Sequence, residues 1–307
     1  MPGLMLLDTP SLYYRAFYGI PESVTAPDGT PVNAVRGLID MIAMLVRQHS
    51  PGELAACMDA DWRPAFRVAA IPSYKTHRLA PGGGEETPDT LAPQVPVIEQ
   101  VLDAAGIARL GVPGYEADDL MGTLALRPRG ETGGGVDIVT GDRDLFQLVD
   151  DGVPIRVLYT ARGVKNLQLV DEAAVTAKYG VPGRSYADFA VLRGDPSDGL
   201  PGVPGVGEKT AAALITRFGS LDALLKALDG DGDLTGAQRN RLEAARDYLR
   251  VAPEVVRVAH DVPVPDVGLT LPAQPRDPRA LTDLAGRHGL GGPLGRLADA
   301  LSWTWRP

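Results

Sequence analysis

The sequence predicts an α/β fold, in which a mostly parallel central sheet has helices on both faces and a smaller helical module follows it. Three short apolar runs each end on an acidic residue or a Gly-Asp pair, as buried parallel strands do: residues 4–7, 54–58 and 136–140. Helical periodicity separates these runs, most clearly over residues 34–48 and 95–105, and such alternation favours parallel pairing. The third observation is a mostly helical stretch over residues 181–250.

The chain divides into three expected parts. These are a core over residues 1–180, a helical module over residues 181–254 and a C-terminal segment over residues 255–307 that packs back on the core. Within the core, residues 72–100 hold a long loop, since residues 79–94 contain three consecutive glycines together with prolines and acids. We expect residues 79–94 to be mobile, and residues 278–302 to form one or two short helices.

Composition limits the class of protein. A chain of 307 residues with 44% hydrophobic content can bury a real core, and no apolar run approaches the ~18 residues of a membrane span, so we expect a cytoplasmic protein without membrane contact. The single cysteine, Cys57, lies in an apolar run and is expected in the core. A net charge of −9 argues against a polyanionic partner, but setting nine clustered acids aside leaves 30 acids against 30 bases.

The nine clustered acids carry the predicted chemistry. They are Asp8, Asp59, Glu116, Asp118, Asp119, Asp142, Asp144, Asp195 and Asp198. Three of them follow predicted strands, and the carboxyl ends of parallel strands meet at one edge of a sheet. So many carboxylates in one place require cations, and Mg²⁺ or Mn²⁺ fits oxygen ligands. None of the four histidines lies in these motifs, so a histidine-rich zinc site is not expected.

The spacing of the acids has a geometric meaning. Glu116 and Asp119 lie three residues apart at the start of a predicted helix, where they share a face and benefit from the helix dipole. If the chain stays extended after residue 140, Asp142 and Asp144 point to the same side. The last two acids, at positions 195 and 198, bracket a turn that can hold both towards one point.

At these residues the sequence resembles the 5′-nuclease family of flap endonucleases and 5′-3′ exonucleases, and it is similar to the N-terminal nuclease domain of bacterial DNA polymerase I. The resemblance covers about residues 4–250. Beyond the acids it rests on YRAF (14–17), FR (66–67), SYKTHR (73–78), GYEADD (114–119), TGDRD (140–144) and GDPSDGLPGVPGVGEKTA (194–211). Because no polymerase domain follows, we expect a free-standing nuclease.

The resemblance implies a PIN-like core and a helix-three-turn-helix module that grips duplex DNA. It implies two or three Mg²⁺ or Mn²⁺ ions held by the nine acids, and a potassium ion at the loop 202–208. Lys75 and Arg78 lie at the base of a helical arch over residues 72–100, where they contact the scissile phosphate. The expected DNA-binding residues are Arg15, Tyr74, Gly202, Gly205, Gly207, Lys209 and Thr210, with Tyr74 stacking on an unpaired base.

The expected substrate is DNA with a 5′ flap, a 5′ overhang or a nick, cut by a nucleoid-associated monomer during replication and repair. The resemblance leaves open whether the 5′ strand is DNA or an RNA primer. A non-catalytic DNA-junction binder with the same fold is the alternative, although such a binder would be expected to shed clustered negative charge.

The sequence departs from the family pattern at three places. Thr9 stands where a glycine or serine is common, Gly199 where asparagine is common, and residues 79–108 contain no Lys or Arg although the arch of relatives usually has another arginine. Arg67 is expected to be a solvated surface group.

Two rival motifs fail at single positions. A nucleotide-binding P-loop over residues 202–210 is excluded because Glu208 stands where the motif requires lysine. A haloacid-type phosphatase motif at Asp8 is excluded because Pro10 replaces its second aspartate.

Overall fold

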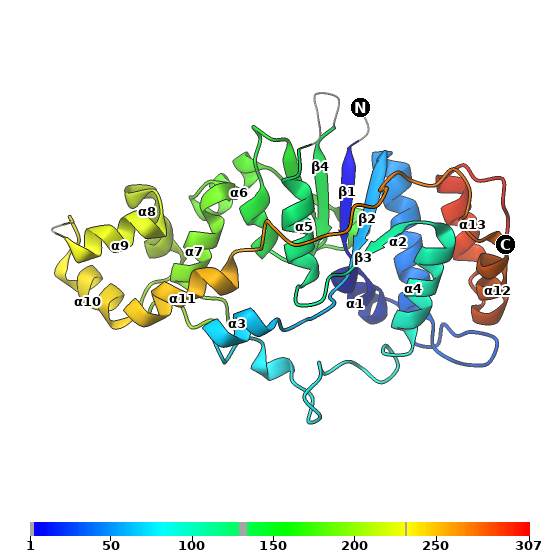
Figure 1. Cartoon of the computed structure of the whole chain (residues 1–307), viewed down its shortest axis with the longest axis horizontal. Coiled ribbons are helices and arrows are strands. Elements are labelled where there is room, and N and C mark those ends of the chain that lie inside the picture. The colour runs from blue at the N-terminus through cyan, green and yellow to red at the C-terminus, as the bar shows by residue number, and fades with distance from the viewer. Residues whose placement is uncertain (1–2, 129–133, 231) are drawn as a thin grey trace.

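A single six-stranded sheet forms the centre of the molecule in the computed structural model, which describes residues 3–128, 134–230 and 232–307 (Figure 1). The strands lie in the order β3-β2-β1-β4-β5-β6. Their bounds are β1 Leu4–Asp8, β2 Glu53–Cys57, β3 Ala108–Leu110, β4 Val136–Thr140, β5 Ile155–Tyr159 and β6 Gln168–Val170. All neighbours pair in parallel except β5 and β6, so the predicted mostly parallel sheet is confirmed.

Strand β1 shows why the predicted strands are continuously apolar. Successive side chains of a strand point to opposite faces, and both faces of this sheet are covered. Leu4 and Leu6 pack into one hydrophobic cluster, whereas Met5 and Leu7 pack into the other. All four side chains are buried, and Cys57 at the end of β2 is buried as expected.

Helices cover the two faces unequally. The face that holds Met5 and Leu7 is covered by α1 Thr9–Gly19, α2 Asn33–His49, α4 Gln94–Ala105, α12 Pro278–His288 and α13 Gly291–Ala300. The opposite face carries α5 Ala117–Ala125, α6 Glu172–Tyr179 and α7 Tyr186–Arg193. The predicted helices over residues 34–48 and 95–105 are therefore confirmed, and the predicted C-terminal helices are α12 and α13.

The helical module extends from the second face, beyond α7 and away from α12 (Figure 1). It consists of α8 Glu208–Phe218, α9 Leu221–Asp229, α10 Gly236–Ala244 and α11 Arg246–Val256. Buried residues of α7, α8 and α11, such as Phe189, Leu214 and Leu249, belong to the same hydrophobic cluster as Leu4 and Leu6 of the sheet. Continuous packing therefore joins the module to the core.

The C-terminal segment returns across the sheet and ends beside α2. Trp303 is buried, and its indole N–H donates a hydrogen bond to the carbonyl of Pro272 at 2.7 Å. None of the helices in the described ranges is long and apolar enough to span a membrane.

The segment between β2 and α4 passes below the carboxyl edge of the sheet. It contains α3 Ala65–Ala70 and the 3-10 turn η1 Thr76–Arg78; the other 3-10 turns are η2 Asp144–Leu148, η3 Val164–Asn166, η4 Gly183–Ser185 and η5 Pro196–Asp198. Residues 79–93 form no helix, as their glycines predict, and only an isolated bridge joins Leu79 to Glu85. The phenol of Tyr14 on α1 hydrogen-bonds the hydroxyl of Thr87 at 3.3 Å, which anchors this loop to the core. Its mobility stays a prediction.

Candidate active site

Asp8 joins the two central strands at the carboxyl edge of the sheet. One carboxylate oxygen accepts a hydrogen bond from the Thr140 hydroxyl at 2.6 Å, and the other accepts one from the Ser11 backbone N–H at 3.1 Å. The second contact caps α1, so the same side chain starts a helix and lines the site. Burial raises the pKa of Asp8 to about 6, although the two hydrogen bonds oppose this shift.

Asp59 and Asp118 lie next to Asp8, at the start of α5. Asp59 accepts a hydrogen bond from the Ala117 backbone N–H at 2.7 Å, at the positive end of that helix. Its side chain is open to solvent, but it lies in a concavity of the protein, where desolvation and then repulsion from Glu116 raise its pKa to about 7. The pKa of Asp118 is raised well above its usual value by burial, followed by repulsion from Asp142 and Asp8.

Asp142 and Asp144 follow β4, but the chain does not stay extended there, so that part of the expectation is wrong. The Asp142 carboxylate accepts a hydrogen bond from the Asp144 backbone N–H at 2.8 Å, and η2 begins at Asp144. This local contact turns the chain, because an aspartate side chain can bond the backbone two residues later. One carboxylate oxygen of Asp144 is buried without a hydrogen-bond partner, and burial together with repulsion from Asp142 raises its pKa well above the usual value.

Asp195 and Asp198 lie at the two ends of the predicted turn, which is confirmed as η5. Asp195 accepts a hydrogen bond from the Ser197 backbone N–H at 2.9 Å and forms an ion pair with Arg193 at 3.2 Å. Burial raises the pKa of Asp198 to about 6, while Lys75 opposes the shift. Gly199 follows with a φ of 74°, a conformation that glycine and asparagine tolerate, which explains how one replaces the other in the family pattern.

Asp142 is the acid that connects the constellation. Its charge contributes to the raised pKa values of Asp8, Asp118, Asp144 and Asp198. The elements that carry the acids divide them into two groups, and the charge of Asp142 acts on members of both. One group contains Asp8, Asp59, Glu116 and Asp118, and the other contains Asp144, Asp195 and Asp198.

The residues fit hard divalent cations. Every donor is an oxygen, and neighbouring charges disfavour the ionised form of several of these acids, which is the condition that bound cations relieve. Among the residues that the structure describes, no three Asp, Glu, His or Cys side chains converge closely enough to form a ready ligand set. Mg²⁺ retains several waters in protein sites, so a wide arrangement of carboxylates can hold it partly through water.

Glu116 is the meeting point of three donors. It accepts hydrogen bonds from the Arg67 guanidinium at 2.5 Å and the Tyr74 phenol at 2.7 Å, and it pairs with the Lys75 ammonium. The ring of Tyr74 is buried, with 2% exposure, so the prediction that it stacks on an unpaired base is wrong. Lys75 is placed by a left-handed backbone with φ 50°, which is uncommon outside glycine.

Arg67 and Asp119 form a buried ion pair behind the site. Arg67 is 2% exposed, so the expectation of a solvated surface group is wrong. Two of its nitrogens contact the two oxygens of Asp119 at 2.8 and 2.6 Å. Asp119 also accepts hydrogen bonds from the backbone N–H groups of Ala259 and Glu116. The prediction that Asp119 binds an ion is therefore corrected: its oxygens are occupied, and it positions Arg67.

Arg78 reaches the second group of acids. Its guanidinium contacts the Ser197 carbonyl at 3.1 Å and an oxygen of Asp198 at 3.4 Å, and its side chain is 39% exposed. The backbone N–H of Lys75 donates to the Asp198 carbonyl at 3.1 Å. The structure therefore brings both predicted cations to the acidic edge. Sequence reasoning missed Thr140, whose signal is its place between a buried strand and the Gly-Asp pair.

The loop before α8 presents the predicted DNA-binding residues. Gly202 and Gly205 have φ values of 66° and 76°, which only glycine adopts readily. Gly207 is the N-cap residue of α8, and a side chain built there would meet open space, so this helix start is accessible. The exposed Lys209 and the half-buried Thr210 follow in the first turn. Sequence reasoning missed Arg241 of α10, which donates to the Gly205 carbonyl at 3.0 Å, because no local pattern links the two segments.

Comparison with known proteins identifies the family. A model of the N-terminal resolvase-like domain of 5′-3′ exonucleases matches residues 3–180, and a model of their C-terminal SAM fold matches residues 181–278. A Streptomyces coelicolor protein described as a 5′-3′ exonuclease is 63% identical over 304 residues, covering 97% of this chain and 100% of that protein. The chain belongs to the 5′-3′ exonuclease family, as the sequence motifs indicate.

Two further relatives extend this result. A 5′-3′ exonuclease of Mycobacterium tuberculosis is 52% identical over 313 residues, covering 97% of each chain. DNA polymerase I of the same species is 44% identical over 277 residues, which cover 90% of this chain and 29% of the polymerase. The fold is shared with the T5 D15 protein co-crystallized with metal ions, at a TM-score of 0.64 and 16% identity, with 98% of this chain and 97% of that one covered. It is also shared with the catalytic core of Rad2 in complex with DNA, at a TM-score of 0.57 and 16% identity, with 98% and 92% covered.

Proposed function

We propose that this protein hydrolyses phosphodiester bonds at 5′ flaps and 5′ ends of DNA with Mg²⁺ or Mn²⁺ as cofactor. The observation that carries the proposal is that the charge of Asp142 acts on two groups of acids at the edge where Lys75 and Arg78 also lie. Two groups of carboxylates suit two ions, the arrangement that two-metal phosphodiester hydrolysis requires.

Eight acids would hold the ions, directly or through water. They are Asp8, Asp59, Glu116, Asp118, Asp142, Asp144, Asp195 and Asp198. When bound, the ions supply a nucleophilic water at neutral pH and stabilise the leaving oxygen. The chain itself supplies the fixed geometry: Thr140 and Ser11 orient Asp8, while Arg67 and Tyr74 orient Glu116.

Lys75 and Arg78 would stabilise the negative charge that develops on the scissile phosphate. In the structure both cations are paired with acids of the site, Lys75 with Glu116 and Arg78 with Asp198. With ions bound, the charges of these acids would be neutralised, and Lys75 and Arg78 would become available to a phosphate.

The loop 202–210 would grip duplex DNA through its phosphates. The accessible start of α8 offers backbone N–H groups and a positive helix dipole, and Lys209 adds a charge. Contacts of this kind read shape rather than sequence. Potassium would bind at residues 202–208 through backbone carbonyls, although the Gly205 carbonyl already accepts a hydrogen bond from Arg241.

The relatives support a role in replication and repair, because DNA polymerase I is among them. Within the proposed organisation, residues 1–180 cut with residues 72–100 as the arch, residues 181–254 bind the duplex, and residues 255–307 complete the core. The protein would act as a monomer on DNA with a 5′ flap, a 5′ overhang or a nick, with or without an RNA primer.

A 5′-labelled flap substrate tests the proposal. Cleavage at the junction with Mg²⁺, its loss in EDTA and a large drop in kcat for Asp142→Asn with unchanged DNA binding are the expected results. A matched substrate with a 5′ RNA segment compares the two kinds of strand. DNA binding without cleavage under any divalent cation would instead establish the non-catalytic junction binder, and full activity in EDTA would rule out the metal mechanism.

A further inference from the structure

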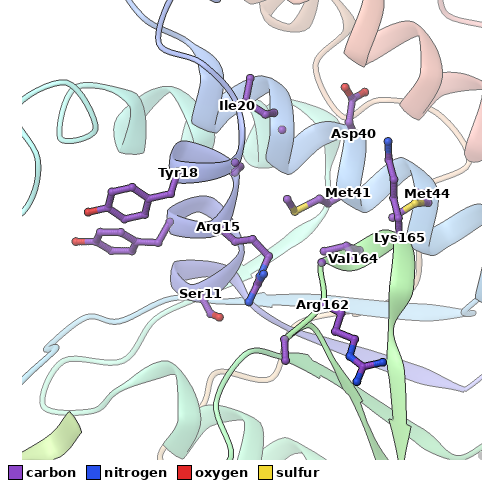
Figure 2. A pocket seen from close by; sticks show the side chains of 16 residues that line it. Ser11, Arg15, Tyr18, Ile20, Asp40, Met41, Met44, Arg162, Val164 and Lys165 are labelled. Carbon is purple, nitrogen blue, oxygen red and sulfur yellow. The ribbon is translucent and has the colours of Figure 1, made fainter.

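A large cavity adjoins the acidic edge, and apart from the expected DNA contact of Arg15 it has no role in the reaction described above. It lies between α1, α2 and the loop that leads from β5 to β6, and its volume is about 1010 Å³. Figure 2 shows Arg15 of α1, Met41 and Met44 of α2 and Val164 of the loop bordering this space. Because the loop follows the carboxyl end of β5, the cavity opens on the same edge of the sheet as the carboxylates.

Three cations line the cavity: Arg15, Arg162 and Lys165. Among the described residues, Arg15, Arg162 and Lys165 have no ion-pair partner, although the protein carries a net charge of −9. One acid, Asp40, also lines the cavity, but it is engaged in two contacts with Arg296 at 2.8 and 3.0 Å. The cavity is therefore positive within an acidic protein, which favours an anionic ligand.

Two buried polar groups without hydrogen-bond partners lie in or next to the wall of the cavity: one belongs to Arg15, which lines it, and the other to Thr160, which precedes the lining residue Ala161. The Nε atom of Arg15 is buried without a hydrogen-bond partner, and so is the hydroxyl of Thr160, a fully buried residue. A methyl group built on Gly141 would lie 3.1 Å from the Thr160 hydroxyl and 3.5 Å from a terminal nitrogen of Arg15. Buried donors normally have partners, so this arrangement lacks an acceptor that a ligand can provide. Gly141 precedes Asp142, which places the anchor beside the carboxylates.

The remaining walls suit a nucleoside rather than a bare ion. Met41, Met44 and Val164 give one side of the cavity an apolar surface, on which a sugar or base can pack. Tyr18 lines both this cavity and a second one, whose other lining residues include His77 and Asp89. Its side chain is among the most exposed large apolar groups, at 73%. An exposed tyrosine between two cavities offers a surface for base stacking.

We propose that this cavity binds a nucleoside phosphate, with the phosphate on Arg15, Arg162 and Lys165 and the base against the apolar wall. The ligand comes either from an unpaired nucleotide of the DNA strand or from a free nucleotide, which presents the same chemistry. This inference rests on the proposed nuclease function for the first source only, since a free nucleotide would bind whether or not the protein cuts DNA.

The test removes the two exposed cations of the loop and leaves Arg15 in place. Arg162→Ala/Lys165→Ala is compared with Arg279→Ala/Arg287→Ala, a pair of exposed arginines on α12 at the far end of the core. Both variants lose two positive charges, so a difference between them reports position rather than net charge. Binding of fluorescent flap DNA is measured in EDTA across a salt series, and binding of deoxyadenosine monophosphate is measured by calorimetry.

We expect the loop variant to lower the slope of log affinity against log salt by about 1, because the three cations hold one phosphate, and the control variant to leave it unchanged. Tyr18→Ala should weaken binding of DNA with an unpaired strand by roughly 5-fold or more, and binding of blunt duplex little. If only nucleotide binding responds to the loop variant, the ligand is a free nucleotide. Equal behaviour of the two charge variants towards both ligands would overturn the proposal. Because all binding is measured without divalent ions, these outcomes are separate from a failure of cleavage.

Discussion

Replacing Arg67 should destabilise the protein far more than replacing an exposed arginine with similar contacts. Arg67 donates to Asp119, to Glu116 and, through Nε, to the Val255 carbonyl at 3.0 Å. The side chains of the three paired residues are 3%, 6% and 0% exposed. Arg67→Met removes the cation and leaves two buried carboxylates, a change that costs about 3–5 kcal/mol. In a chain of this size roughly 2 °C of melting temperature corresponds to 1 kcal/mol, so the melting point should fall by about 6–10 °C.

Arg156 provides the matched control. It contacts both oxygens of Asp137 at 2.5 and 3.3 Å, but its side chain is 49% exposed, so Arg156→Met should cost at most about 1 kcal/mol. The double variant Arg67→Met/Asp119→Leu should recover part of the loss, because it removes one stranded charge. Calorimetry or thermal denaturation in EDTA measures all of these variants. A fall of less than about 2 °C for Arg67→Met would refute the argument that burial of this pair controls stability.

Three further variants or conditions test the site. Tyr74→Phe should raise the Mg²⁺ concentration needed for half-maximal activity, because Glu116 loses the hydrogen bond from the Tyr74 phenol at 2.7 Å. A change confined to DNA affinity would instead restore the base-stacking role of Tyr74. Gly207→Asp should weaken duplex binding and lower its salt dependence without unfolding the protein, because its side chain enters open space at the proposed phosphate contact. Unchanged affinity in a salt titration would contradict this. In EDTA the melting temperature should fall as pH rises from about 4 to 7, because the folded protein retains protons on Asp8 and Asp59 (pKa about 6 and about 7) that the unfolded chain has lost. Mg²⁺ should therefore stabilise the protein more at about pH 8 than at about pH 5. A melting temperature that does not change with pH would contradict the raised pKa values.

The strands that the sequence predicted are those buried on both faces. β1, β2 and β4 lie at the centre of the sheet, where continuous apolar runs are required. The three strands that were missed lie further out. β3 and β6 are short edge strands of three residues each, and the exposed Arg156 interrupts the apolar pattern of β5. Edge strands need little apolar character, so periodicity does not reveal them.

The acids of the site could be predicted because each follows an element that the sequence marks locally. Arg67 and Tyr74 could not, because what decides their burial lies 52 and 42 residues away in Asp119 and Glu116. Arginine side chains are mostly exposed in proteins, and tyrosine side chains are amphipathic. Only the tertiary fold shows which partners cover Arg67 and Tyr74. Asp119 was misassigned for the same reason, since its spacing from Glu116 is the same whether it faces an ion or an arginine.

The segment 73–78 connects the two groups of acids mechanically. Lys75 pairs with Glu116 in the first group, while Arg78 contacts Asp198 in the second, and the Lys75 backbone N–H binds the Asp198 carbonyl. The left-handed backbone of Lys75 holds this short segment in a conformation that its surroundings must maintain. A phosphate that attracts both cations therefore loosens their contacts with both groups at once. Divalent ions bound as proposed would favour the same change, because they would neutralise the acids that hold the cations. Binding of DNA and binding of divalent ions should consequently promote each other, a reciprocity that linked equilibria require.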